Sequence, residues 1–115
     1  MTSRLLCAWV LAASVGLAAP AHGADRVIRV TAKRFEYAPA EITLRRGEPV
    51  VLELTSLDRD HGFRCDELGL RADVKPGEVT RVRLVPQQVG RFPFACDVFC
   101  GDGHEDMAGE IDVVE

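Results

Sequence analysis

Four residues with metal-binding side chains lie close together near the carboxyl end of this chain, in the stretch CDVFCGDGHEDM. Cys96, Cys100, His104 and Met107 follow the spacing C-x-x-x-C-x-x-x-H-x-x-M. Thiolate and thioether sulfurs select copper(I), and a group of cysteine, histidine and methionine can hold copper in both oxidation states. The spacing therefore predicts a copper site that serves redox chemistry rather than hydrolysis.

A second histidine, His61, lies far from this stretch, in the segment DRDHGF that follows an apolar run ending near Leu54. Loops at one end of a β-sandwich can bring such distant segments together. Asp60, the preceding residue, is then a candidate hydrogen-bond partner for the histidine ring. Two cysteines, two histidines and a methionine are one strong ligand more than a single blue-copper ion uses, because that site takes one cysteine. The extra thiolate could bridge two copper ions.

Two cysteines at this spacing also occur in three different kinds of site. Cys96 and Cys100 can form a disulfide in an exported protein, but a disulfide leaves the spacing of His104 and Met107 without a cause, and we expect it only when copper is absent. Zinc accepts two cysteines and two histidines, yet it gains little from a thioether. A copper-carrying thioredoxin-like protein can also have two cysteines three residues apart, but here the flanking segments are predicted strands.

The 115-residue chain is long enough for one domain. Residues 1–23 contain an early arginine, a fifteen-residue apolar run and small residues before position 24, which are the three parts of a secretory signal peptide. The apolar run is shorter than the roughly 20 residues of a membrane-spanning helix. We therefore expect cleavage after Gly23, no remaining transmembrane anchor, and a periplasmic or secreted protein. An uncleaved amino-terminal anchor is the alternative.

The predicted mature domain, residues 24–115, keeps 18 acidic and 13 basic residues, a net charge of −5. Its basic residues are scattered among the acidic ones, which argues against a nucleic-acid partner. Three cysteines remain in this domain, and an odd number cannot all pair within one chain. Metal binding accounts for two of them. The third, Cys65, is expected to be a buried small apolar residue, with an intermolecular disulfide or an extra soft ligand as alternatives.

Short β-type runs separated by turns occupy the whole predicted domain, and no stretch has helical periodicity over a useful length. In one of these runs Arg81 and Arg83 are expected to face water, and in the last one Ile111 and Val113 should point to the same side. Regularly spaced short strands predict an all-β fold, a Greek-key β-sandwich. The expected strands are residues 27–30, 41–44, 49–54, 79–84, 90–95 and 109–114.

Two segments resemble the copper-binding domain of cytochrome c oxidase subunit II, namely HGFRCDELGL at residues 61–70 and VPQQVGRFPFACDVFCGDGHEDM at residues 85–107. The resemblance implies a cupredoxin fold and the binuclear, mixed-valence copper centre called CuA, which nitrous oxide reductase also contains. That family's subunit has two transmembrane helices before its soluble domain, and this chain has room for neither. It therefore resembles a free-standing exported relative.

The ligand positions of that family match six residues here, and their roles are implied by the resemblance. Val98 stands where the oxidase subunit has a glutamate that reaches a magnesium site, so magnesium is not expected. The implied roles are bridging of both coppers by Cys96 and Cys100, one copper each for His61 and His104, weak ligation of one copper by Met107, and ligation of the other by the backbone carbonyl of Val98.

These observations predict an exported protein that transfers single electrons through two copper ions per chain, with one ion as the alternative. The expected partner is a periplasmic redox protein such as a cytochrome. A periplasmic copper carrier or assembly factor, delivering copper to an oxidase or reductase, is the alternative function. An enzyme is not expected, because no nucleophile and base occur at a recognisable spacing and a fully ligated copper has no open position for substrate. The chain could still supply electrons to a separate oxidase or reductase.

Overall fold

The computed structural model describes residues 25–102 and 106–115. The predicted signal peptide, residues 1–23, and the predicted ligand His104 both lie outside these ranges. Within the described part of the chain, no helix has the length and apolar character needed to cross a bilayer.

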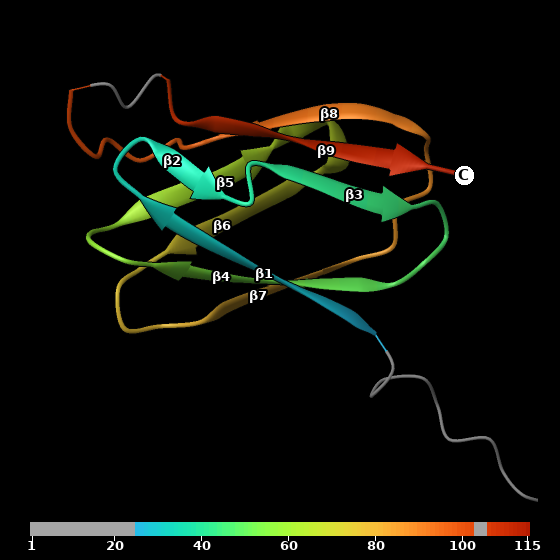
Figure 1. Ribbon diagram of the computed structural model, residues 1–115, viewed down its shortest axis with the longest axis horizontal. Coiled ribbons are helices and arrows are strands. Elements are labelled where there is room, and N and C mark those ends of the chain that lie inside the picture. The colour runs from blue at the N-terminus through green and yellow to red at the C-terminus, as the bar shows by residue number, and fades with distance from the viewer. Residues whose placement is uncertain (1–24, 103–105) are drawn as a thin grey trace, which may run out of the picture.

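The described residues form two β-sheets that pack into a sandwich (Figure 1). One sheet has the strand order β2-β1-β4-β7 and the other has the order β3-β9-β8-β5-β6. The parallel pairs β1 with β4 and β3 with β9 join strands that are not consecutive in the chain. This arrangement confirms the predicted all-β sandwich. The elements are β1 (Arg26–Lys33), β2 (Glu36–Ala38), β3 (Glu41–Arg45), β4 (Val50–Ser56), β5 (His61–Cys65), the short 3-10 helix η2 (Asp66–Leu68), β6 (Leu70–Val74), β7 (Thr80–Leu84), β8 (Gly90–Ala95) and β9 (Ala108–Val114).

Six of these strands arise where the sequence alternates apolar and polar residues or forms a short β-rich run. In β9 the side chains of Ile111 and Val113 are both buried, as predicted, because alternate residues of a strand face the same side. In β7 Arg81 and Arg83 are exposed, also as predicted. The alternation thus determines which face of each sheet lies against the other.

Three strands were not predicted, namely β2, β5 and β6. We expected His61 in a loop, and this was wrong, because it is the first residue of β5. Four of the five β5 residues are buried, so the strand lacks the polar alternation that would have revealed it. Its strand character comes from pairing with β6, in which His61 lies opposite Val74.

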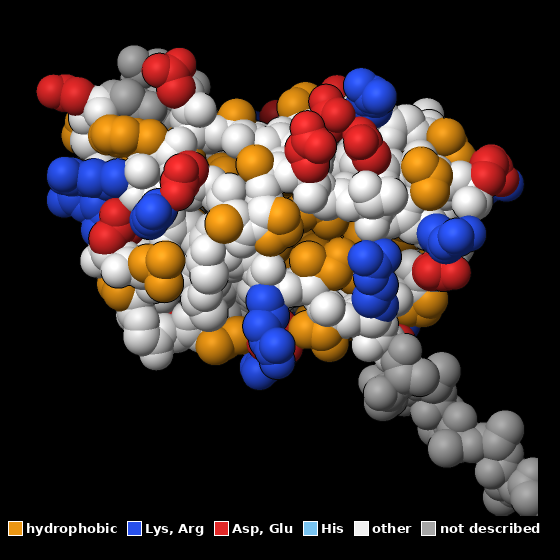
Figure 2. Space-filling view, viewed as in Figure 1, with side chains coloured by type: hydrophobic (Ala, Val, Ile, Leu, Met, Phe, Trp, Pro, Cys, Tyr) orange, Lys and Arg blue, Asp and Glu red, His pale blue; other side chains and the backbone are white. Residues whose placement is uncertain are grey.

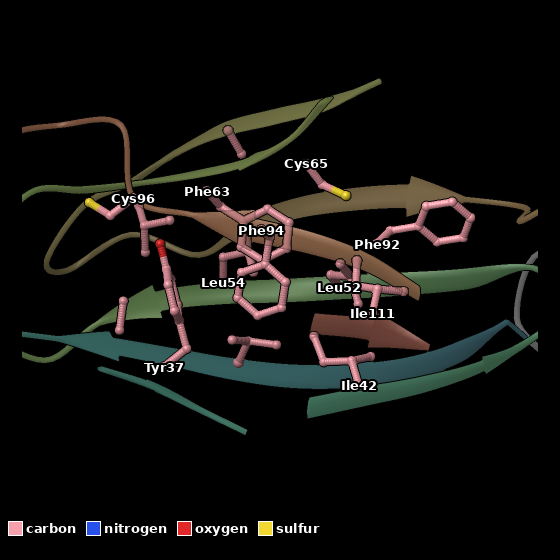
Figure 3. Packing of buried hydrophobic residues seen from close by; sticks show 14 of the residues in the cluster. Tyr37, Ile42, Leu52, Leu54, Phe63, Cys65, Phe92, Phe94, Cys96 and Ile111 are labelled. Atoms are coloured by element: carbon pink, nitrogen blue, oxygen red, sulfur yellow. The ribbon is translucent and has the colours of Figure 1, made fainter. Parts of the chain in front are cut away.

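The core between the sheets contains an aromatic cluster next to the predicted metal-binding residues (Figure 3). The ring of Tyr37 packs edge-on against Phe94 with 4.9 Å between ring centroids, and Phe63 lies 4.5 Å from Phe94. Cys65 is fully buried in this core, which agrees with its expected role as a small apolar residue. On the molecular face drawn in Figure 2, several acidic side chains lie together near the upper edge, and the basic side chains are spread over the rest of the face.

We predict that Gly109→Ala destabilises the fold, because a Cβ atom at this position in β9 would collide with the ring of Phe94 and with the carbonyl oxygen of Ala40. Overpacking of this kind costs about 1–3 kcal/mol. Urea unfolding measures the loss. Adding Phe94→Leu to the variant should recover part of it, although Phe94→Leu alone destabilises. Unchanged stability of Gly109→Ala would contradict the close packing of β8 and β9.

Candidate metal centre

Three of the predicted ligands come together at one end of the sandwich. His61, Cys96 and Cys100 each place one ligand atom within 4.8 Å of the other two. His61 begins β5, whereas the two cysteines lie in the loop between β8 and β9. All three side chains are buried, with exposed fractions of 1%, 6% and 0%. The fold therefore joins segments that are 35 residues or more apart in the sequence.

Two further predicted ligands lie beside the cysteine sulfurs. The thioether sulfur of Met107 is fully buried and lies 3.9 Å from the Sγ atom of Cys100. The carbonyl oxygen of Val98 accepts a hydrogen bond from the thiol of Cys96 at 3.2 Å. The structure thus brings together five of the six predicted ligands, and the sixth, His104, lies outside the described residues.

The ring of His61 is oriented by a carboxylate. Its Nε2 atom lies 2.6 Å from an oxygen of Asp58. Because an ionised carboxylate only accepts hydrogen bonds, Nε2 carries the proton and Nδ1 keeps its lone pair in the neutral ring. Nδ1 is buried and has no hydrogen-bond partner among residues 25–102 and 106–115. An unpartnered lone pair near two thiols is the arrangement that a metal ion would satisfy.

The carboxylate that orients His61 is not the one we expected. We considered Asp60 because it is adjacent in sequence, but the structure assigns this role to Asp58. No feature of the sequence separates the two, since both lie in the same loop and only the path of that loop decides which carboxylate reaches the ring. Burial by itself would raise the pKa of Asp58. Hydrogen bonds from His61 and from the backbone N–H groups of Arg34 and Arg59 outweigh it and lower the pKa to about 2.

The sulfur of Cys96 is surrounded by polar groups of the core. The backbone N–H of Gly62 donates to this sulfur at 3.3 Å, and the hydroxyl of Tyr37 donates to the carbonyl of Gly62 at 2.6 Å. Figure 3 shows the Tyr37 hydroxyl pointing toward Cys96. Burial and the neighbouring Cys96 thiol raise the pKa of this hydroxyl, so Tyr37 stays protonated. Tyr37 was not among the predicted site residues.

The two cysteines are present as thiols. Burial, followed by the proximity of Cys96, raises the pKa of Cys100. Metal ions bind thiolates, so metal binding at this site has to release protons from the sulfurs. Two thiols, a thioether and an imidazole lone pair are buried together here, and the three sulfur atoms are soft donors that match copper better than they match zinc.

Contacts at both ends of the loop between β8 and β9 hold it in place. At its start, the guanidinium of Arg71 makes two hydrogen bonds of 2.9 Å to the carboxylate of Asp97. The backbone N–H of Cys96 bonds to the carbonyl of Met107 at 3.1 Å, which closes the loop. A side chain on Gly62 would collide with Asp97, so glycine allows β5 to approach the loop closely.

Asp58→Asn is expected to weaken copper binding by about 10–100-fold, since substitutions of groups that orient metal ligands have effects of this size. Asparagine would turn an N–H donor toward one of the backbone N–H groups that the carboxylate now accepts. Competition with a copper chelator measures the affinity. Asp60→Asn, an exposed carboxylate two residues away, is the matched control and should bind copper normally. Equal affinities in the two variants would show that Asp58 does not orient the ligand.

Comparison with known proteins finds relatives of this chain in sequence and in fold. Residues 4–113 match the family described as the cupredoxin-like domain. The chain is 36% identical over 88 residues to cytochrome c oxidase subunit 2 of Thermus thermophilus, an alignment that covers 76% of this chain. That alignment covers 65% of the relative, and a second Thermus thermophilus protein of the same name is covered to 52%, so the chain spans about half to two thirds of their length.

Two solved structures have a similar fold. The periplasmic domain of subunit II of cytochrome oxidase from Bradyrhizobium japonicum has a TM-score of 0.73 at 20% identity, covering 79% of this chain and 85% of that one. The metal-binding domain of the Cu(I)-exporting P-type ATPase of Streptococcus pneumoniae D39, solved with Cu(I), has a TM-score of 0.59 at 26% identity. This second match covers 77% of this chain and 85% of that one.

Proposed function

Because this chain belongs to the cupredoxin-like domain family and resembles cytochrome c oxidase subunit II, we propose that it transfers single electrons through a binuclear copper centre of the CuA type. The observation that carries the proposal is the convergence of buried donors, with His61, Cys96 and Cys100 within 4.8 Å of one another. The unpartnered Nδ1 atom of His61 among them supports metal binding rather than simple packing.

Each predicted ligand has a binding role in this centre. Cys96 and Cys100 would bridge two copper ions, and His61 would bind one ion through Nδ1. His104 and Met107 would complete the ligands from the loop, together with the backbone carbonyl of Val98. When bound, such a pair shares one unpaired electron, which spreads the bond-length changes of reduction over both metals. We assign no catalytic step to this chain, because each of these donors serves to hold metal.

The protein part of the site is suited to repeated electron transfer because it is rigid. Buried aromatic rings pack behind Cys96, and Asp58 fixes the ring of His61. Ligands that stay in place in both oxidation states keep the structural change on reduction small. Rigid support from outside the ligand shell is a general requirement of metal sites that must keep their geometry.

Exchange of electrons with a partner requires a short path from the metal ligands to the surface. Phe99 precedes Cys100 directly, and its side chain is 75% exposed. We assign Phe99 to the surface that contacts the redox partner, which we take to be a periplasmic protein such as a cytochrome.

Residues 1–23 would serve as the signal peptide that exports the chain. Mass spectrometry of protein purified from the periplasm would detect cleavage after Gly23.

A copper carrier that delivers copper to an oxidase or reductase is the alternative function. The similarity to the copper-binding domain of a Cu(I) exporter is the observation on its side. The relative with the higher identity is an oxidase subunit, and it favours electron transfer. A carrier should exchange copper(I) readily and show little reversible colour, whereas an electron carrier should keep its copper through many redox cycles.

The test is to load the purified protein with copper, count copper per chain, and record visible absorption and electron paramagnetic resonance spectra. Two coppers per chain, a purple colour and a hyperfine pattern from one electron shared by two nuclei are expected. Repeated reduction and reoxidation should leave the copper count unchanged. One copper per chain, or a colourless protein that holds only copper(I), would overturn the proposal in favour of the carrier.

A further inference from the structure

Two arginines from separate loops donate to one backbone carbonyl in the metal-binding loop. Arg34, just after β1, donates from Nε to the carbonyl of Cys100 at 3.2 Å. Arg59, in the loop between β4 and β5, donates from Nη1 to the same oxygen at 2.9 Å. These contacts join segments that are 66 and 41 residues apart in the sequence. Neither arginine is among the predicted ligands.

The same two arginines also contact the carboxylate that orients His61. The backbone N–H of Arg34 donates to Oδ2 of Asp58 at 2.7 Å, and that of Arg59 donates to Oδ1 at 2.7 Å. Their main chains therefore hold the group that orients the histidine, while their side chains hold the segment that contains Cys100. Arg34 and Arg59 therefore connect the segment that contains His61 with the segment that contains Cys100.

The backbone next to Cys100 has a conformation that favours glycine. Gly101 has a φ of +128°, and a Cβ atom placed on it would lie 3.4 Å from Nε of Arg34. That distance is an ordinary van der Waals contact, so a Cβ atom would fit beside the guanidinium, but the positive φ would strain the backbone of any residue with a side chain. Glycine thus suits the backbone path next to the carbonyl that both arginines bind.

We propose that Arg34 and Arg59 are positioning residues. They hold the segment around Cys100 against the segment that contains Asp58 and His61 before metal binds. The guanidinium group presents several donors in a rigid plane, whereas lysine offers a mobile point charge. Donors that already stand in place lose less conformational freedom when metal arrives, and the metal then leaves more slowly. The inference rests on the proposed copper site for its purpose, but the hydrogen bonds of Arg34 and Arg59 to the carbonyl of Cys100 do not involve any of the proposed ligand atoms.

The test compares Arg34→Gln/Arg59→Gln, Arg34→Lys/Arg59→Lys and, as a control, Arg81→Gln, which alters an exposed arginine on β7. In the copper-free Gln variant, the NMR order parameters of residues 99–102 should fall from about 0.85 to below about 0.6, the range of flexible backbone. Loss of copper to a chelator should become about 10–100-fold faster. The Lys variant should show both effects, and the control should show neither.

Unchanged order parameters and copper loss in the Gln variant would overturn the proposal. A Lys variant identical to the wild type would also overturn it. The positive charge alone would then hold the segment, and the planar set of guanidinium donors would not be needed. Circular dichroism checks that each variant folds, and Arg59→Gln alone provides the test if the double variant unfolds. If the wild type binds no copper, the order parameters still test whether Arg34 and Arg59 hold the Cys100 segment. Failure of the proposed copper function can therefore be told apart from failure of this inference.

Discussion

A chain that carries both Cys96→Ser and Cys100→Ser is expected to lose the paired copper centre completely. The two thiols are the central donors of the buried group, and serine hydroxyls are poor ligands for copper(I), which prefers soft sulfur. Copper per chain should fall from two to below one, and the purple colour should disappear. Visible absorption and metal analysis measure both changes.

The matched control for this variant is Cys65→Ser, which alters the other cysteine of the described domain. Cys65 lies in the hydrophobic core and is not part of the three-residue donor group. The control buries a hydroxyl and therefore loses some stability, but it should keep two coppers and the purple colour. A double Cys96/Cys100 variant that retained the colour would place the copper elsewhere.

Copper loading is expected to raise the thermal unfolding midpoint by about 15–30 °C. At a copper concentration about 1,000 times the dissociation constant, binding to the native state alone adds about 4 kcal/mol. For a domain of this size each kcal/mol shifts the midpoint by about 4–8 °C. The physical source is local, because a metal ion would satisfy the buried Nδ1 atom of His61, which has no hydrogen-bond partner among the described residues, and would bind the buried sulfur of Cys100.

Differential scanning calorimetry with and without copper, and again after a chelator removes the metal, measures this shift. The double Cys96/Cys100 variant is the control and should show little change on copper addition. A wild-type midpoint that does not respond to copper would mean that metal binds equally well to unfolded chains or not at all. Either result would contradict a site that depends on the fold.

Both predictions depend on the same feature, namely that the ligands come from two separate parts of the chain. Three soft donors lie in or next to one loop, but His61 reaches them only because β5 lies beside that loop. The hydrogen bond from the N–H of Gly62 to the sulfur of Cys96 crosses this junction. Unfolding therefore separates the ligands and releases the metal, which links copper affinity to stability.

Much of the candidate site was predictable from the sequence because its chemistry is local. Cys96, Cys100, His104 and Met107 follow one another at short intervals, so residue types and spacing alone indicated a soft-metal site. Alternating apolar residues predicted six strands for a similar reason, since a strand with one buried face shows its period of two in the sequence. The resemblance to oxidase subunit II added the ligand role of His61 and the carbonyl of Val98.

Only the tertiary structure decided how these residues are supported. Pairing with the next strand, β6, makes His61 part of a strand, and the path of one loop selects Asp58 instead of Asp60 as its partner. The contacts of Arg34 and Arg59 with the carbonyl of Cys100 join three loops. The sequence by itself thus determined the chemical nature of the donors, because side-chain chemistry is carried by each residue. Their orientation depends on the path of each loop and on contacts between separate segments of the chain, and neither leaves a local pattern in the sequence.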